Sequence, residues 1–324
     1  PAPVEEIPAI QNPALWGGVQ ITRGCGRGCQ FCSPTQQLRR DFPLERILQE
    51  VEVNIRGGSS MILVITDDVF LYHCYPGFSP NRDALLKLFS RIASVPGVRH
   101  IQICHSSLPP VLLDQKLVAE LCELLIPYSP ARLGGHPILL TEIGIETGST
   151  RLIRKYMLGK PKPFPPEKWP DVVEEALRIM NDHDWCPVAT ILIGLPGETE
   201  EDAIATLELI DRISDLRVSL IPVLFVPEAN CALRDATQMQ LAALSDEQLE
   251  VFAACWRQNI RLWGPQFLCG GGLFRSVFRF ALPYIIHMLY YIKHRRLYGS
   301  RIKRTLREIA DAVRAVRCVA SVRT

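Results

Sequence analysis

Long hydrophobic runs are lacking in this chain of 324 residues, although 48% of its residues are hydrophobic. No apolar stretch reaches the ~18 residues that a membrane-spanning helix needs, and nothing resembles a secretory signal peptide. An excess of one charge is lacking too, since 36 Lys and Arg stand against 34 Asp and Glu, for a net charge of +2. The composition therefore excludes a disordered chain and predicts a packed globular protein. The length allows one large core with an appendage, or two modest domains.

The balanced charge hides an asymmetry between the carboxyl-terminal segment and the rest of the chain. Residues 273–324 hold twelve Lys and Arg against two acids, a balance of +10, so the preceding residues carry −8. A basic segment on an acidic body favours an anionic binding surface. Within it, residues 280–292 are mostly apolar, and they are long enough to lie in a membrane interface with their flanking cations at the headgroups. The competing interpretation is a helix that closes the core, followed by a solvated basic helix.

Eleven cysteines are many for this length, but the pattern of a secreted disulfide framework is lacking. We therefore expect a reducing compartment, that is a cytoplasmic protein, peripheral on the inner face of the membrane if residues 273–324 bind lipid. Three cysteines share one short stretch. The other eight stand alone and are expected to be mostly buried free thiols: Cys74, Cys104, Cys122, Cys186, Cys231, Cys255, Cys269 and Cys318.

The first residues have no initiating Met and no helical or strand period. Residues 1–16, which begin at Pro1, are Pro-rich and predict an extended linker. A linker at the first position leads us to expect a further domain upstream.

Six apolar runs rich in β-branched residues alternate with amphipathic stretches along the next 200 residues. Each is followed by apolar residues at helical spacing, which predicts six strand–helix units in a core domain over 17–235, with a helical extension over 236–272 and a basic apolar helical segment over 273–324. The predicted strands are 18–22, 61–66, 100–104, 138–146, 188–194 and 216–226.

Strands that alternate with helices predict parallel pairing through right-handed crossovers. A doubly wound sheet would fit this order, but no Gly-rich phosphate loop follows the first strand. Polar residues instead gather just after each strand, where a barrel of this class places its active site. The fold predicted is α/β, a partial (β/α)6 barrel with a C-terminal helical extension.

The loop after the first strand reads RGCGRGCQFC and holds Cys25, Cys29 and Cys32 with the spacing C-x3-C-x2-C. A structural zinc site closes with a fourth ligand, and no second Cys or His pair with metal spacing follows. A ferredoxin run would have a shorter first gap and a fourth cysteine. The pattern favours a 4Fe-4S cluster on three thiolates, which leaves one iron without a protein ligand.

With Phe31 before the last cysteine, this loop resembles the signature of the radical S-adenosylmethionine superfamily, whose core is a partial TIM-like barrel. The resemblance implies that S-adenosylmethionine fills the open iron position. It further implies an enzyme in which the reduced cluster cleaves this cofactor and a 5′-deoxyadenosyl radical abstracts hydrogen from a substrate C–H bond.

Further motifs support the resemblance and supply candidate cofactor-binding residues. TEIGIETGS (141–149) resembles the fourth-strand motif, with Glu146 and Thr147, and ILIGLPGETEED (191–202) resembles the fifth-strand motif, with Ile193 and Gly194. The remaining candidates are Asp67, Asp68, Ser106 and Lys160. For the two aspartates a pair of turn caps is the alternative, and Glu146 has a structural alternative as well.

The motif set is most similar to the branch that usually carries an N-terminal cobalamin-binding domain. Cobalamin is therefore an expectation about an absent upstream domain. The main hypothesis is methylation or C–C bond formation on a membrane lipid. The alternatives are a methylthiotransferase-like enzyme that modifies RNA and a non-catalytic zinc or iron–sulfur protein. Flavodoxin or ferredoxin is the expected reductant, and nucleic acid is not expected as a partner because no aromatic–basic platform accompanies the basic residues.

Cys104 and His105 end the third predicted strand and so come at the edge where the active site is expected. Two interpretations of this thiol are open. It is a structural cysteine buried in the core, or it quenches a radical or carries a methyl group in the cavity.

Overall fold

The computed structural model describes residues 3–269 together with Arg307 and Asp311. The expectations for residues 273–324, and for the last residues of the helical extension, lie outside the described residues. No helix in the described part of the chain is long and apolar enough to cross a membrane.

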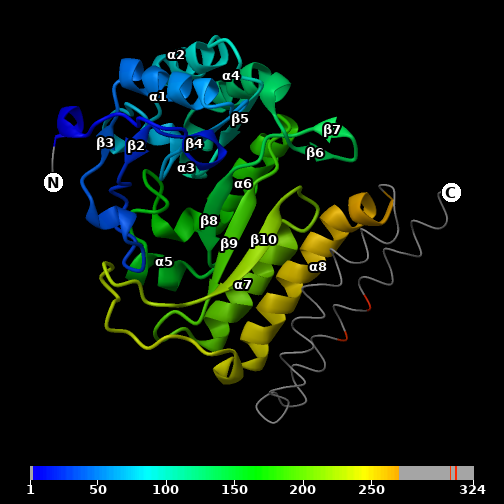
Figure 1. Ribbon diagram of the computed structural model, residues 1–324. Coiled ribbons are helices and arrows are strands. Elements are labelled where there is room, and N and C mark those ends of the chain that lie inside the picture. Colours follow the sequence, from blue (N-terminus) through cyan, green and yellow to red (C-terminus); the bar gives the residue numbers. More distant parts are fainter. Residues whose placement is uncertain (1–2, 270–306, 308–310, 312–324) are drawn as a thin grey trace.

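Six parallel strands form two three-stranded sheets (Figure 1). The first contains β1 (Gly18–Gln20), β4 (Met61–Ile65) and β5 (His100–Ile103), and the second contains β8 (Glu142–Glu146), β9 (Val188–Ile193) and β10 (Ser219–Leu224). An isolated parallel bridge between His105 and Glu142 joins them, with Glu142 N donating to Cys104 O at 2.8 Å. The six predicted strands therefore all exist, and they lie side by side in chain order.

Two short antiparallel ladders were not predicted. One pairs β2 (Thr22–Arg23) with β3 (Arg40–Asp41), and the other pairs β6 (Arg132–Leu133) with β7 (His136–Pro137). Strands of two residues carry too short an alternation to be recognised in a sequence. The first ladder matters for the site because it closes the base of the cysteine loop.

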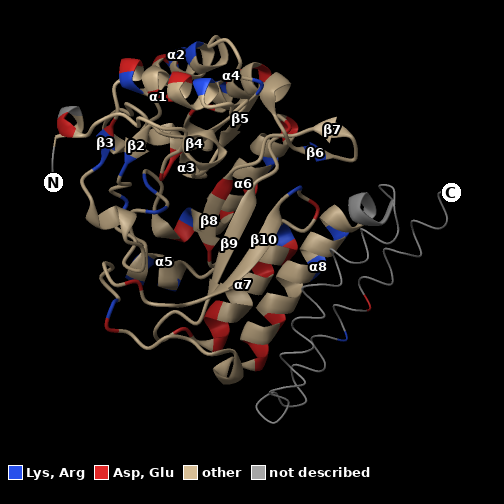
Figure 2. Ribbon diagram, viewed as in Figure 1, with Lys and Arg blue, Asp and Glu red and all other residues tan. Residues whose placement is uncertain are grey.

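Helices follow the parallel strands and bury their apolar faces against them. Side chains cap the first turns of several of them: Asn81 accepts from Ala84 N, Asp114 from Leu117 N and Ser149 from Leu152 N. The helices are α1 (Leu44–Arg56), α2 (Arg82–Ala93), α3 (Pro109–Leu113), α4 (Gln115–Leu125), α5 (Thr150–Tyr156), α6 (Trp169–Asp182), α7 (Glu200–Arg212) and α8 (Asp246–Cys269). Acidic residues colour the outer side of α7 in Figure 2, as expected for a body with negative balance.

Helix α8 covers the outer edge of β10. Asn259 accepts a hydrogen bond from Leu220 N at 2.7 Å and donates one to Leu220 O at 2.6 Å. The amide side chain thus satisfies the backbone of an edge strand as a further strand would. No ladder joins β10 to β1 within residues 3–269, so the α/β architecture with parallel strands is confirmed as a partial barrel.

Candidate functional site

The cysteine loop lies between β2 and β3 and is bound to the carboxyl end of β4. Gly24, Gly26 and Gly28 all have φ near +80°, a conformation that favours glycine. Gly24 N donates to Asp67 Oδ2 at 2.7 Å. The glycines allow the tight path of the loop, and the β4 carboxylate fixes its beginning.

Arg27 connects the loop to three other segments and is 5% exposed. Its Nη2 lies 3.3 Å from Asp68 Oδ2 and donates to Ser107 Oγ at 3.1 Å. Its Nη1 donates to the carbonyls of Gly159, Lys160 and Lys162 at 3.2 to 3.4 Å. A buried guanidinium needs both a counter-charge and acceptors, and Arg27 has both.

Further contacts hold the second half of the loop. Gln30 N donates to Tyr156 O at 2.9 Å, and Gln30 O accepts from Leu233 N at 3.1 Å. Ser33 N donates to Glu228 Oε2 at 3.0 Å. The loop that carries the three cysteines is therefore anchored to β4, to the end of α5 and to the segment after β10.

The environment of the three thiols is set by burial and by one another's charge. Burial, Asp68 and Cys29 raise the pKa of Cys25 to about 11, and Arg27 lowers it in part. Burial and the other two thiols raise the pKa of Cys32 to about 12, and burial raises the pKa of Cys29 as well. Three thiolates on one short loop need a cationic centre to neutralise them.

The donor set fits a 4Fe-4S cluster better than a single ion. Among residues 3–269 no three His, Cys, Asp or Glu side chains gather closely enough to hold one metal ion. A four-iron cluster takes one thiolate at each of several irons, so its ligands stand farther apart than those of a single ion. Three soft thiolates on one preformed loop match that requirement.

Glu146 ends β8 in an unusual backbone conformation. Its φ is +68°, and the pairing of β8 with β9 shifts register between Gly144 and Glu146. Trp169 Nε1 supports this kink by donating to the carbonyls of Ile145 and Thr147 at 3.2 and 3.1 Å. A non-glycine residue held at positive φ marks a site where geometry is retained at an energetic cost.

The kink brings Glu146 to Lys160, and both side chains are nearly buried. Lys160 Nζ lies 3.2 Å from Glu146 Oε1, and Thr190 Oγ1 donates to Glu146 Oε2 at 3.0 Å. Burial lowers the pKa of Lys160, but Glu146 and Cys29 outweigh it and keep the ammonium charged. Since Arg27 of the cysteine loop donates to Lys160 O at 3.2 Å, the pair lies beside that loop.

Gly144 leaves the space that this pair occupies. A Cβ built on Gly144 would lie 2.1 Å from Glu146 Oε1 and 2.6 Å from Lys160 Nζ. The glycine of the GIE motif therefore has a steric explanation, because a side chain at this position would overlap the Glu146–Lys160 pair.

The structure gives Asp67 and Asp68 contacts within the protein. Asp67 holds Gly24 N, as described, while Asp68 caps a 3-10 turn by accepting from Phe70 N at 3.1 Å and pairs with Arg27. Both aspartates contact the cysteine loop or residues next to it. Asp68 caps a turn, as the alternative interpretation of these residues expected. Ser106 differs from them: it is 5% exposed, and its Oγ has no hydrogen-bond partner among the described residues. A buried hydroxyl without a partner is the signature of a group that awaits a ligand.

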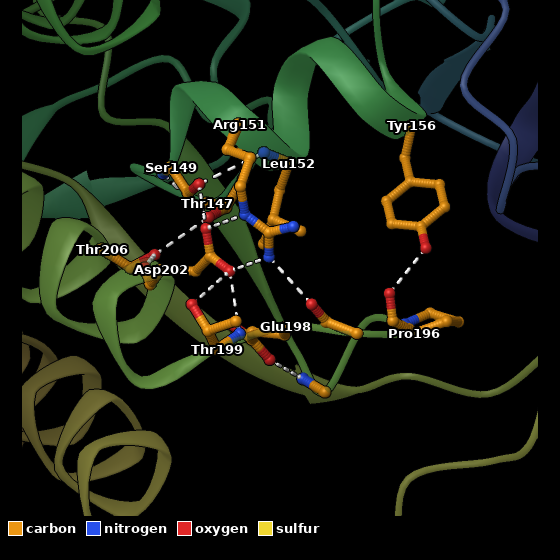
Figure 3. A network of polar contacts seen from close by, with 12 residues as sticks. Thr147, Ser149, Arg151, Leu152, Tyr156, Pro196, Glu198, Thr199, Asp202 and Thr206 are labelled. Carbon is orange, nitrogen blue, oxygen red and sulfur yellow. Dashed lines mark hydrogen bonds and ion pairs between the residues drawn. The ribbon is translucent and has the colours of Figure 1, made fainter.

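Thr147 belongs to a polar network that joins the β8–α5 turn to α7 (Figure 3). Its Oγ1 lies 3.0 Å from Thr206 Oγ1 and accepts from Ser149 N at 3.0 Å. The centre of the network is Asp202, which accepts from Ser149, from both the amide and the hydroxyl of Thr199, and from Arg151. The network ties the two motif loops to each other.

The remaining candidates lie at the end of β9 and in the cysteine loop. Ile193 is buried, and Gly194, with φ of +87°, donates its N–H to Glu198 Oε2. A Cβ on Gly194 would lie 2.3 Å from Met239 Cγ, so this turn also requires glycine. Phe31 is half-buried and packs on the core.

Sequence reasoning missed Arg27 and Thr190. The partners of Arg27 at 159–162 lie more than 130 positions away, and no local pattern indicates them. Thr190 had a signal, because it is the one polar residue in the apolar strand VATILI.

Comparisons with known proteins identify a family and several relatives of this chain. The model of the radical SAM superfamily matches residues 19–210. The tRNA-2-methylthio-N(6)-dimethylallyladenosine synthase of Magnetococcus marinus is 26% identical over 213 residues, which are 64% of this chain and 44% of that protein. The synthase of the same name from Desulfosudis oleivorans is 25% identical over 214 residues, which are 64% of this chain and 41% of that protein. This chain thus spans less than half the length of these relatives.

Two solved structures are similar to part of this chain. The radical S-adenosylmethionine methyltransferase TsrM from Kitasatospora setae, with cobalamin and a 4Fe-4S cluster bound, has a TM-score of 0.47 and 14% identity over 67% of this chain and 36% of that one. A spore photoproduct lyase mutant has a TM-score of 0.44 and 13% identity over 75% of this chain and 72% of that one. The family model matches more than half of this chain, and the chain therefore belongs to the radical SAM superfamily of enzymes.

Proposed function

We propose that this chain binds a 4Fe-4S cluster through Cys25, Cys29 and Cys32 and binds S-adenosylmethionine beside it, to start radical chemistry on a substrate C–H bond. The observation that carries the proposal is the convergence of the cysteine loop with the buried Glu146–Lys160 pair. When bound, the cluster and S-adenosylmethionine supply the electron and the 5′-deoxyadenosyl radical for hydrogen abstraction.

The Glu146–Lys160 pair is complementary to the methionyl end of the cofactor, which carries one ammonium and one carboxylate. Glu146 would bind the ammonium and Lys160 the carboxylate, each exchanging its present partner for the opposite charge on the ligand. The exchange replaces one buried ion pair by two, so neither charge is left uncompensated. Ser106 Oγ offers a further hydrogen bond in the same region.

The role of the remaining residues is to hold this arrangement and to exclude water. Arg27 joins the cysteine loop to the backbone of Lys160, so that the cluster ligands and the cofactor-binding lysine move as one unit. The Asp202 network fixes the turn after Glu146 against α7. Such preorganisation limits solvent access and the side reactions of a radical.

The test is anaerobic reconstitution with iron and sulfide, followed by dithionite and S-adenosylmethionine, with 5′-deoxyadenosine as the product assayed. We expect product from the wild-type protein and none from Cys29→Ala. The matched control is Cys122→Ala, a buried thiol on α4, which should retain activity. Product from Cys29→Ala would refute the proposed cluster ligands, and absence of iron–sulfur absorbance in the wild type would return the three thiols to a zinc site.

The cofactor pair has its own test. Lys160→Met should weaken S-adenosylmethionine binding to the reconstituted protein by tenfold or more at unchanged iron content, because a buried ion pair loses one member. Lys155→Met is the control, since this lysine lies nearby on α5 and outside the pair. Equal affinities of the two variants would refute the assignment.

For the substrate, the relatives favour RNA over lipid. The two synthases named above carry a tRNA adenosine derivative in their names, whereas a lipid substrate rests on the composition of residues 273–324. We therefore place methylthiotransferase-like RNA modification first, and methylation or C–C bond formation on a membrane lipid second. Incubation of the reconstituted enzyme with deuterated tRNA or deuterated lipid extract, followed by measurement of deuterium in 5′-deoxyadenosine, separates the two.

Two partners complete the proposal. A low-potential electron donor such as flavodoxin or ferredoxin would reduce the cluster, and cobalamin would be a further cofactor. Binding of cobalamin to the full-length protein, measured by its visible absorbance, tests the second.

A further inference from the structure

A second set of reactive side chains lies where the two sheets meet. Cys104 Sγ lies 2.8 Å from His105 Nδ1, and His105 Nε2 lies 3.0 Å from Glu142 Oε2. Cys104 and His105 follow β5 and Glu142 begins β8, so the parallel bridge between the sheets assembles the three. A nucleophile, a base within hydrogen-bond reach and a third group that orients the base form the arrangement used for covalent catalysis.

The hydrogen bonds among the three side chains set the direction of proton transfer, from Cys104 to His105. Glu142 is an acceptor and so favours the imidazole tautomer with hydrogen on Nε2, which leaves the Nδ1 lone pair directed at the Cys104 thiol. Burial, Glu142 and Asp67 raise the pKa of Cys104 to about 11, so the resting group is the thiol. A thiol of this kind becomes a nucleophile only if a base removes its proton as the new bond forms.

The three residues adjoin the cofactor site without being part of it. Asp67, whose charge acts on Cys104, also holds Gly24 of the cysteine loop. Ser106 carries the unpartnered hydroxyl, and the Ser107 hydroxyl donates to Asp68. His105 and Glu142 are about half exposed in their side chains, so a ligand reaches them from solvent.

We infer that Cys104, His105 and Glu142 form a second reactive centre, in which the Cys104 thiol attacks an electrophilic alkyl carbon of a bound small molecule. In this step Sγ forms a bond to the carbon, the leaving group departs with the electron pair of its bond to that carbon, and the thiol proton passes to His105 Nδ1. Glu142 stabilises the imidazolium through Nε2–H. The step needs no oxidant or reductant, and it does not depend on which substrate the radical chemistry serves.

The experiment alkylates the reconstituted, cluster-loaded protein with iodoacetamide under anaerobic conditions and follows each cysteine by peptide mass spectrometry from pH 6 to 10. Cys74 is the internal control, since it is also half-buried and next to a histidine in sequence, but His73 Nδ1 faces Asp41 at 3.7 Å. We expect the rate at Cys104 to depend less steeply on pH than the rate at Cys74, because His105 Nδ1 accepts the proton of the Cys104 thiol as the new bond forms. The charged and titratable groups that face Cys104 are His105, Glu142 and Asp67.

At pH 7.5 His105→Gln should lower the rate at Cys104 about 10²-fold, the usual size of general-base assistance, and leave Cys74 unchanged. Glu142→Gln should lower the Cys104 rate by a smaller factor, about tenfold, because a neutral amide stabilises the imidazolium less than a carboxylate does. Identical pH profiles for Cys104 and Cys74 in the wild-type protein would overturn the inference without recourse to any variant. So would a His105→Gln protein alkylated at the wild-type rate.

Discussion

The Asp202 network allows a quantitative prediction about stability. The Asp202 side chain is 4% exposed and is the common acceptor of Ser149, Arg151 and Thr199. Burial alone would raise the pKa of Asp202, but hydrogen bonds from Arg151, Ser149 and Thr199 outweigh it and lower the pKa from 3.8 to about 2. Such a shift corresponds to about 2 kcal/mol of folding free energy at neutral pH.

The sign of the pH dependence follows from the direction of the shift. The pKa is lower in the folded state, so the contribution is complete above pH 4 and is lost as pH falls through 4 toward 2. Asp202→Asn should therefore unfold with about 2 kcal/mol less free energy than wild type at pH 7. This difference should shrink toward zero as pH approaches 2.

Urea unfolding at a series of pH values measures both quantities. The matched control is Asp215→Asn, which removes a half-exposed ion pair with Arg178 at 3.2 Å and should change the free energy of unfolding much less, because solvent screens an exposed pair. If the difference between Asp202→Asn and wild type is the same at pH 3 as at pH 7, then Asp202 is not ionised through this network and the reasoning fails.

Substitutions at three further positions test other parts of the site and the fold. Gly144→Ala must displace the Glu146–Lys160 pair, so affinity for S-adenosylmethionine should fall at least tenfold while iron content stays the same; unchanged affinity in a binding titration would contradict this. Arg27→Met leaves the charge of Asp68 buried without a counter-ion, which should cost about 3–5 kcal/mol in urea unfolding, with a smaller loss for Arg27→Lys. Asn259→Leu removes both hydrogen-bond partners of the β10 edge. Amide hydrogen exchange in β10 next to α8 should accelerate by a factor that corresponds to about 1–3 kcal/mol. Unaltered exchange would show that packing alone protects the edge.

The alternation of strands and helices was predictable because it follows from the local periodicity of apolar residues. Apolar runs such as 188–194 and 61–66 became β9 and β4, and the helical spacing after each predicted its crossover helix. Parallel pairing follows from such alternation, since parallel neighbours must be joined by a crossover. The two-residue ladders and the edge-capping role of Asn259 carried no comparable period.

The sequence by itself indicated the three cysteines as candidate cluster ligands, because a cluster loop needs its thiolates at close spacing and C-x3-C-x2-C is complete within eight residues. Tertiary structure alone decided what surrounds them. Arg27 meets its acceptors at 159–162, and His105 meets Glu142, through strand register and loop packing across tens to more than a hundred positions. The side-chain period of two in a strand tells which face of the sheet a residue occupies. It does not tell which residue of a distant strand lies opposite. These contacts could therefore not be predicted from the sequence.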